Sequence, residues 1–190
     1  MGWVVLVFIL AVGVALYLWY AAIVTRRNRV SEALAGIDVQ LQQRYDLIPN
    51  VLTIARRFMD HERGLLEEIT ELRNRASAAA GDRDFATAER RFETERRLGA
   101  DMTRLFALAE SYPDLKSSGP MMEAQRNYAE VEANLSASRR FYNSAVSDLR
   151  NIVEIFPGGY LKGLAGVSAL PPFFDADDSV RSPVPASKYL

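Results

Sequence analysis

The sequence contains no cysteine and a single histidine, His61, among its 190 residues. The lack of cysteine excludes thiol catalysis, disulfide bonds and cysteine-based zinc sites. His61 precedes Glu62, but position 65 is a leucine, so the second histidine of a zinc-protease motif is missing. We therefore expect no catalytic residues, no metal site and no cofactor.

The sequence also lacks an excess of either charge, because 23 basic residues face 24 acidic ones and the net charge is −1. A general nucleic-acid-binding protein carries a basic excess. We therefore expect no nucleic-acid partner. Asp175, Asp177 and Asp178 are acidic neighbours near the C-terminus, but they lack the glycine and the distal glutamate of a calcium-binding loop.

Charged residues are absent from residues 3–24, a run in which only Gly13 falls outside the apolar set. At 1.5 Å per residue this run extends about 33 Å, close to the thickness of a membrane's hydrocarbon core. A secretory signal peptide would begin with a basic segment, and only Met1 and Gly2 precede the run. We predict a retained transmembrane helix over residues 1–25.

The flanks of this run predict its orientation. The N-terminal side has no basic residue, whereas three arginines follow the run closely. The positive-inside rule then places the N-terminus outside and the rest of the chain in the cytoplasm. We expect the basic and aromatic side chains at this end to anchor the helix at the lipid headgroups: Trp19, Tyr20, Arg26, Arg27 and Arg29.

Proline is absent from residues 51–112 and from residues 121–156, which leaves room for long helices. Apolar residues recur at spacings of three and four in four segments, at about residues 26–46, 47–80, 84–111 and 120–156. These stripes predict an all-α fold in which residues 26–157 form an up-and-down antiparallel bundle of long helices.

The segment around Pro49 allows two interpretations. Asp46 is a suitable N-cap and Pro49 is tolerated in the first turn of a helix, which favours a turn here and a four-helix bundle. The apolar stripe nevertheless continues from Leu41 to Leu52 without a shift in its spacing of three and four residues. One kinked helix would show the same continuity, and the bundle would then have three helices. With a turn, a second helix of about 51 Å would overrun the first, so that Ala80 lies beside the headgroups or the bundle tilts.

Polar residues beside the apolar stripes are candidates for contacts that fix the register of the helices, because buried polar groups need partners. Arg139 is expected to pair with another helix, for instance through Asp38 or Asp46, and its replacement by alanine should destabilise the bundle. A ligand pocket is the alternative use of these residues. The candidates are Asp38, Gln40, Asp46, Glu132, Arg139 and Asn143.

Residues 158–174 are apolar and rich in glycine and proline, with Lys162 as their single charge, and they are too short to span a bilayer. They are either a strap that covers the end of the bundle or an adhesive segment for self-association or the membrane interface. The candidate self-association residues are Tyr160, Leu161, Leu164, Val167, Leu170, Phe173 and Phe174. Residues 175–190 are expected to form a mobile tail.

Several short motifs resemble those of the LemA family, and they occur in the family's order from about residue 27 to residue 178. The clearest are Asp46-Leu47-Ile48-Pro49-Asn50, His61-Glu62, Tyr112-Pro113-Asp114-Leu115-Lys116, Tyr142-Asn143, Phe156-Pro157 and Phe173-Phe174 with the acidic residues that follow. The resemblance implies a bacterial single-pass protein of the inner membrane with a helical bundle. It implies no agreed enzymatic activity.

The absence of a catalytic set and the resemblance together favour a structural role. We expect a non-enzymatic protein that self-associates and organises or shapes the membrane, with membrane lipid and further copies of the chain as partners. The alternative is a membrane-anchored adaptor that presents a helical groove to a partner such as a membrane protease or sensor. Either role is expected to need neither metal nor cofactor.

Overall fold

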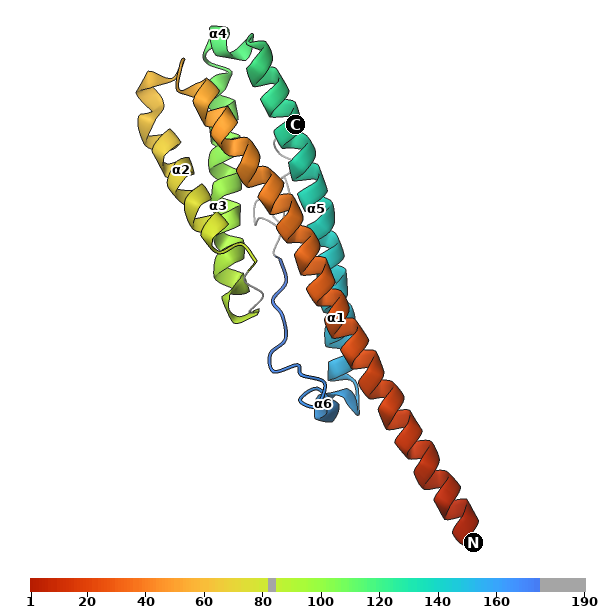
Figure 1. Ribbon diagram of the computed structural model, residues 1–190. Coiled ribbons are helices and arrows are strands. Elements are labelled where there is room, and N and C mark those ends of the chain that lie inside the picture. The colour runs from red at the N-terminus through yellow and green to blue at the C-terminus, as the bar shows by residue number, and fades with distance from the viewer. Residues whose placement is uncertain (82–84, 175–190) are drawn as a thin grey trace, which may run out of the picture.

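The computed structural model describes residues 1–81 and 85–174, and within them it contains helices and no strand. The elements are α1 (Gly2–Ala55), η1 (Asp60–Glu62), α2 (Arg63–Ala78), α3 (Phe85–Ala109), α4 (Pro113–Lys116), α5 (Gly119–Glu154) and α6 (Gly158–Leu161). The four longer helices α1, α2, α3 and α5 run up and down in succession (Figure 1). The predicted all-α bundle is confirmed.

The first helix does not break at Pro49. α1 continues through this proline to Ala55, so the predicted turn at residues 46–50 is wrong. A proline has no N–H to donate to the carbonyl one turn earlier, here that of Tyr45. The side chain of Arg73, from α2, donates to that carbonyl instead, with 3.2 Å between Nε and O. The unbroken phase of the apolar stripe predicted this continuity, but the three-helix bundle that accompanied it is wrong, because the chain turns between Ala55 and Arg63 and α2 is a separate helix.

The chain turns after Ala55, where the helix tightens at its end. The N–H groups of Arg57 and Phe58 bond to carbonyls three residues back, at 3.2 and 3.0 Å, and the buried Met59 closes the turn. α2 then has only 16 residues. It therefore does not overrun α1, and α2 ends well short of α6 in Figure 1, so the predicted approach of Ala80 to the headgroups is wrong.

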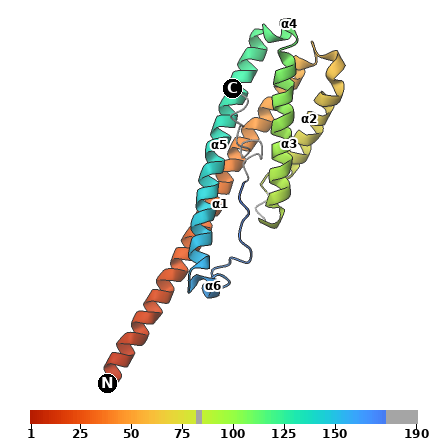
Figure 2. The ribbon, with the colours of Figure 1, turned by 180° about the vertical axis from the view of Figure 1, so that it is seen from behind.

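The longest contact in the bundle joins α1 and α5, which lie side by side and antiparallel over most of their lengths (Figures 1 and 2). The apolar stripes of both helices are buried along this seam, among them Ile37, Leu41, Leu135 and Leu149. The N-terminus of α5 is capped by Ser118, whose Oγ accepts from the N–H of Met121 at 3.2 Å. The seam holds the part of the structure on which the candidate site is built.

The helices differ in length, which leaves one end of the seam uncovered by α2 and α3. At 1.5 Å per residue α5 measures about 54 Å, α3 about 38 Å and α2 about 24 Å. The predicted strap, residues 158–174, begins with α6, and its residues 162–174 run back toward α3 and cover this end (Figure 2). Ala165, Val167 and Phe174 are buried within it. The predicted C-terminal tail, residues 175–190, lies outside the described residues.

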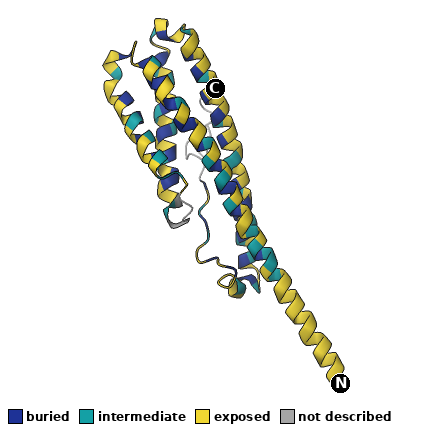
Figure 3. Cartoon of the chain, in the orientation of Figure 1, coloured by how far each residue is buried: buried dark blue, intermediate teal, exposed yellow. Residues whose placement is uncertain are grey.

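The N-terminal part of α1 projects from the bundle alone (Figure 3). Residues 1–18 are exposed on every side of the helix. Among the described residues α1 is the one helix long and apolar enough to cross a membrane, with a mean hydropathy of 2.5 over its most apolar 18-residue window. The bundle therefore stands at the end of an apolar stalk.

Candidate functional site

The centre of the bundle holds a buried arginine, Arg44 of α1, at a position that the stripe would otherwise give to an apolar residue. Its side chain has no exposed surface. It pairs with Glu95 of α3, with 3.4 Å between Nη1 and Oε2, and with Glu132 of α5, with 3.0 Å between Nε and Oε1. It also donates to the hydroxyl of Tyr128 at 3.1 Å. Arg44 thus joins three helices.

Glu95 is the buried acidic partner of this arginine. Its side chain is fully covered, and the hydroxyl of Tyr45 donates a hydrogen bond to Oε1. Burial raises the pKa of the Glu95 carboxyl above its ordinary value, against the opposing effects of the Tyr45 hydrogen bond and the charge of Arg44. Gly99 lies one turn further along α3, and a Cβ there would stand 2.7 Å from Nη2 of Arg44. The guanidinium fits because this position has no side chain.

A second ion pair lies on the same two helices, one turn before Glu95 on α3 and six residues before Arg44 on α1. Arg91 of α3 is 3% exposed and pairs with Asp38 of α1, which is 19% exposed. Along the chain, α1 carries Asp38 and then Arg44, whereas α3 carries Arg91 and then Glu95. The order of acid and base is therefore opposite on the two helices. A shift of one turn between the helices would bring like charges together, so the two pairs specify the register of α1 against α3.

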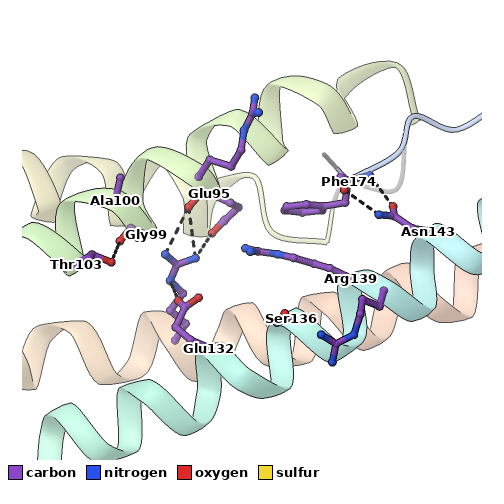
Figure 4. Close-up of a pocket in the computed structure, with 12 residues that line it drawn as sticks. Glu95, Gly99, Ala100, Thr103, Glu132, Ser136, Arg139, Asn143 and Phe174 are labelled. Carbon is purple, nitrogen blue, oxygen red and sulfur yellow. Dashed lines mark hydrogen bonds and ion pairs between the residues drawn. The ribbon is translucent and has the colours of Figure 1, made fainter. Parts of the chain in front are cut away.

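Beside Arg44 a hollow of about 510 Å³ opens between α3 and α5. Four arginines and two glutamates line it, so basic groups are in excess, together with Thr103, Ser136 and Asn143. Figure 4 shows the side chain of Arg139 extended between Glu95 and Phe174. The guanidinium lies over the Phe174 ring, 4.3 Å from its centroid, and Nε is buried without a hydrogen-bond partner. The arginines of the lining are Arg44, Arg96, Arg139 and Arg140.

Phe174, at the end of the strap, forms one wall of the hollow, and hydrogen bonds from α5 hold this part of the strap in place. The side-chain amide of Asn143 donates to the carbonyl of Phe174 at 2.9 Å and accepts from its N–H at 2.8 Å. Tyr142 and Arg150 donate to the carbonyls of Pro172 and Pro171 at 2.9 and 2.8 Å. Polar groups of α5 therefore fix the backbone of the strap.

The structure brings several of the predicted register residues to this region. Asp38 and Glu132 have the ion pairs described, while Arg139 contacts Phe174 and neither Asp38 nor Asp46. Gln40 is partly buried, and its Oε1 has no hydrogen-bond partner. Asp46 is exposed and accepts from Gln42 within α1, so its predicted burial and its predicted N-cap are wrong.

Within residues 1–81 and 85–174 the structure buries the charged side chains of Arg44, Arg91 and Glu95, and sequence reasoning missed all of them. A signal for them was present. Arg44 follows Leu41 by three residues and precedes Ile48 by four, and Glu95 follows Phe92 by three. A charged residue that occupies a stripe position is a candidate for a buried pair.

The residues predicted to anchor the stalk at the headgroups have contacts within the chain. The indole of Trp19 donates to the carbonyl of Ile152 at 3.3 Å, and Arg27 donates to that of Ala165 at 3.2 Å. Arg29 is 3.9 Å from Asp148. Arg26 donates back to Ala22 within the helix, and Tyr20 is 36% exposed. A role at the headgroups stays a prediction.

The candidate self-association segment divides into two groups. Val167 and Phe174 are buried in the strap, and Leu161 and Leu170 pack against the core. Tyr160, Leu164 and Phe173 are 82%, 75% and 39% exposed. Leu161 and Leu170 are partly buried, so the second group has most of the surface that the segment can offer to another molecule.

The chemistry that this site can perform is the binding of a negatively charged group. Guanidinium groups present several N–H donors in a plane and bind carboxylates and phosphates through paired hydrogen bonds. Across the described residues, no three side chains of the His, Cys, Asp and Glu types gather as metal ligands would. His61 lies in η1 at the end of the bundle distant from the stalk, and it is exposed.

The family model of the LemA family matches residues 33–187. The chain belongs to the LemA family. The match contains the whole of the buried charge cluster and the hollow, so both lie in the part of this LemA-family chain that is common to the family model. A search of curated proteins finds no match to the chain.

Proposed function

We propose that this LemA-family chain is a non-enzymatic, membrane-anchored adaptor that binds an acidic segment of a partner protein in the hollow between α3 and α5. The observation that carries the proposal is the lining of that hollow, where four arginines outnumber two glutamates. Arg44 is already paired with both glutamates, which leaves Arg96, Arg139 and Arg140 to meet an incoming carboxylate.

The rigidity of the walls supports binding over catalysis. Two long helices and a strap held by four hydrogen bonds form the walls, so the backbone positions that carry the arginines are set before a ligand arrives. General acid–base chemistry would need a titratable group within reach of the ligand. The hollow has Glu95 and Glu132, and both are engaged by Arg44.

The stalk supports a membrane location for this adaptor. We infer that residues 3–24 cross the bacterial inner membrane, with the N-terminus outside and the bundle in the cytoplasm, because arginines follow the run and none precedes it. The chain has no native cysteine. Single cysteines placed at positions 2 and 122 can therefore be labelled from either side of sealed vesicles, and the inference requires labelling from opposite sides.

The adaptor is tested by removing two exposed arginines of the hollow. The variant R96Q/R140Q is compared with R104Q/R126Q, which removes the same charge from the same two helices at exposed positions outside the hollow. After gentle detergent extraction and affinity capture, we expect the first variant to lose a partner that the second retains. Equal capture by both variants would refute the role of the hollow.

A second candidate is the self-associating scaffold. It is supported by the stalk, whose residues 1–18 are exposed on every side and include the small residues Ala11, Gly13 and Ala15. The burial of Val167 and Phe174 argues against the strap as the contact between copies. Light scattering of the extracted protein separates the two roles, since the scaffold requires a large homo-oligomer and the adaptor a monomer or dimer with its partner.

A further inference from the structure

The end of the bundle nearest the stalk overlaps the apolar run of α1. Trp19, five residues before Val24, donates to the carbonyl of Ile152 of α5. Ile155, which directly follows the end of α5, shares a groove of about 600 Å³ with Ala15 and Leu18. Since α5 runs antiparallel to α1, its C-terminal end overlaps the last third of the apolar run.

This overlap shortens the part of α1 that is free to contact lipid. Residues 3–18 are exposed all round, whereas Trp19 is half-buried and Ile23 is fully buried against the bundle. Sixteen residues extend about 24 Å, and the hydrocarbon core of a bilayer is about 30 Å thick. A gap of about 6 Å is left for the end of the bundle to fill.

The surface at this end of the bundle is apolar and aromatic, as a surface in contact with lipid would be. Ile155, Phe156, Tyr160 and Leu164 are 57%, 78%, 82% and 75% exposed. The rings of Phe156 and Tyr160 lie edge to face with 6.1 Å between their centroids. The apolar stripe of α5 predicts that Phe156 faces the core, yet in the structure it faces outward. Aromatic and apolar side chains gathered at one end of a soluble domain would be costly in water.

The backbone holds these side chains together. A Cβ at Gly158 would stand 1.9 Å from the carbonyl oxygen of Ile152, so the chain folds back tightly after α5 only because this residue is glycine. Arg27 fixes the other end of the loop through the carbonyl of Ala165. Figure 1 shows α6 beside α1 at the level where the stalk leaves the bundle.

We propose that this end of the bundle is a membrane-docking surface, made of Ile155, Phe156, Tyr160 and Leu164, that is immersed in the lipid beside the stalk. Arg26 shares a groove with Ile155, and Lys162 lies between Tyr160 and Leu164 in the sequence, so both would meet the phosphates of the headgroups. The immersion fixes the height and tilt of the bundle, and therefore holds the hollow at a set distance from the bilayer. The proposal rests on the membrane anchor put forward under Proposed function.

The experiment uses single-cysteine variants of the full-length protein, which has no cysteine of its own. An environment-sensitive fluorophore is attached at position 156 or 160 in vesicles of phosphatidylethanolamine and phosphatidylglycerol. Position 122, exposed at the other end of α5, is the aqueous control, and position 10, in the stalk, is the lipid control. Quenching is measured with aqueous iodide and with lipids that carry a nitroxide on the acyl chain.

We expect the labels at positions 156 and 160 to be quenched by the lipid nitroxide and several-fold less by iodide than the label at position 122. If position 10 is protected from iodide while positions 156 and 160 match position 122, the docking surface is refuted and the anchor stands. If iodide reaches position 10 as well, the anchor itself fails, and the docking surface fails with it.

Discussion

The ion pair between Arg44 and Glu95 gives the sharpest test of how this bundle is held together. Both side chains are fully covered, and they lie on different helices. In the variant R44M the methionine fills much of the space, but Glu95 loses its ion pair and keeps the hydrogen bond from Tyr45 and the weaker attraction of Arg91 and Arg139. Breaking a buried pair in this way costs about 3–5 kcal/mol of unfolding free energy, because a buried charge loses its ion-pair partner.

Glu132, the other carboxylate that pairs with Arg44, provides a comparison with Glu95. The side chain of Glu132 is 32% exposed, so water reaches it when its partner is absent. We expect E132Q to cost only about 0.5–1.5 kcal/mol, because the glutamine still offers an oxygen to Arg44 and Glu95 remains as the ion-pair partner of Arg44. The double variant R44M/E95L removes both buried charges, and we expect it to recover most of the loss of R44M, since a buried pair replaced by apolar groups is often close to neutral.

The assay is urea unfolding of the full-length protein in detergent, followed by circular dichroism. R44M should also become more sensitive to pH, because loss of Arg44 raises the pKa of Glu95 further. Its deficit against the unmodified protein should therefore be larger at pH 8 than at pH 5. Two results would refute this account. One is an unfolding midpoint for R44M that matches that of the unmodified protein. The other is a loss of stability in R44M/E95L as large as the losses of R44M and E95L added together.

Further predictions concern the same cluster, the strap and the fold of the chain after α5. Burial raises the pKa of Glu95, so the folded state binds a proton at this carboxyl more tightly than the unfolded state does. The unfolding free energy should therefore fall as pH rises above 4.5, and the variant E95Q should lack this part of the pH dependence. N143A removes two hydrogen bonds to Phe174, about 1–3 kcal/mol in all, and should raise hydrogen exchange at the amides of Phe173 and Phe174, whereas N50A, an exposed control in α1, should not. R139A should lower the unfolding free energy by about 0.5–2 kcal/mol through the lost contact with the Phe174 ring, and R140A should not. G158A should lower the melting temperature more than G163A, because only the first adds a Cβ that meets backbone at the end of α5.

Much of the architecture was predictable because it depends on local spacing. The stripe of α5, from Met121 to Leu149, alternates spacings of three and four, and its buried residues follow that pattern. The N-cap at Ser118 and the left-handed Gly81, with φ of +81°, lie where the sequence predicts helix ends. Such features are decided by a few neighbouring residues, so they can be inferred without knowledge of the rest of the chain.

The turn between the first two helices was not predictable in this way. Pro49 and Asp46 form a strong local turn signal, and residues 56–59 contain neither glycine nor proline. The helix continues through Pro49 because Arg73, from another helix, supplies the donor that the proline lacks. A partner 24 residues away decided the outcome, and no local rule includes it.

By itself, the sequence determined that this LemA-family protein is an apolar stalk followed by long amphipathic helices, since composition and periodicity report which surfaces avoid water. Only the tertiary structure decided which charges are buried together, that Asn143 holds the strap, and that Phe156 faces outward beside the stalk. The physical reason is that the helical period does not determine which side chain of another helix a buried charged or polar group will meet. Its partner depends on which helices pack together and at what height, and the unequal lengths of α2, α3 and α5 set that height.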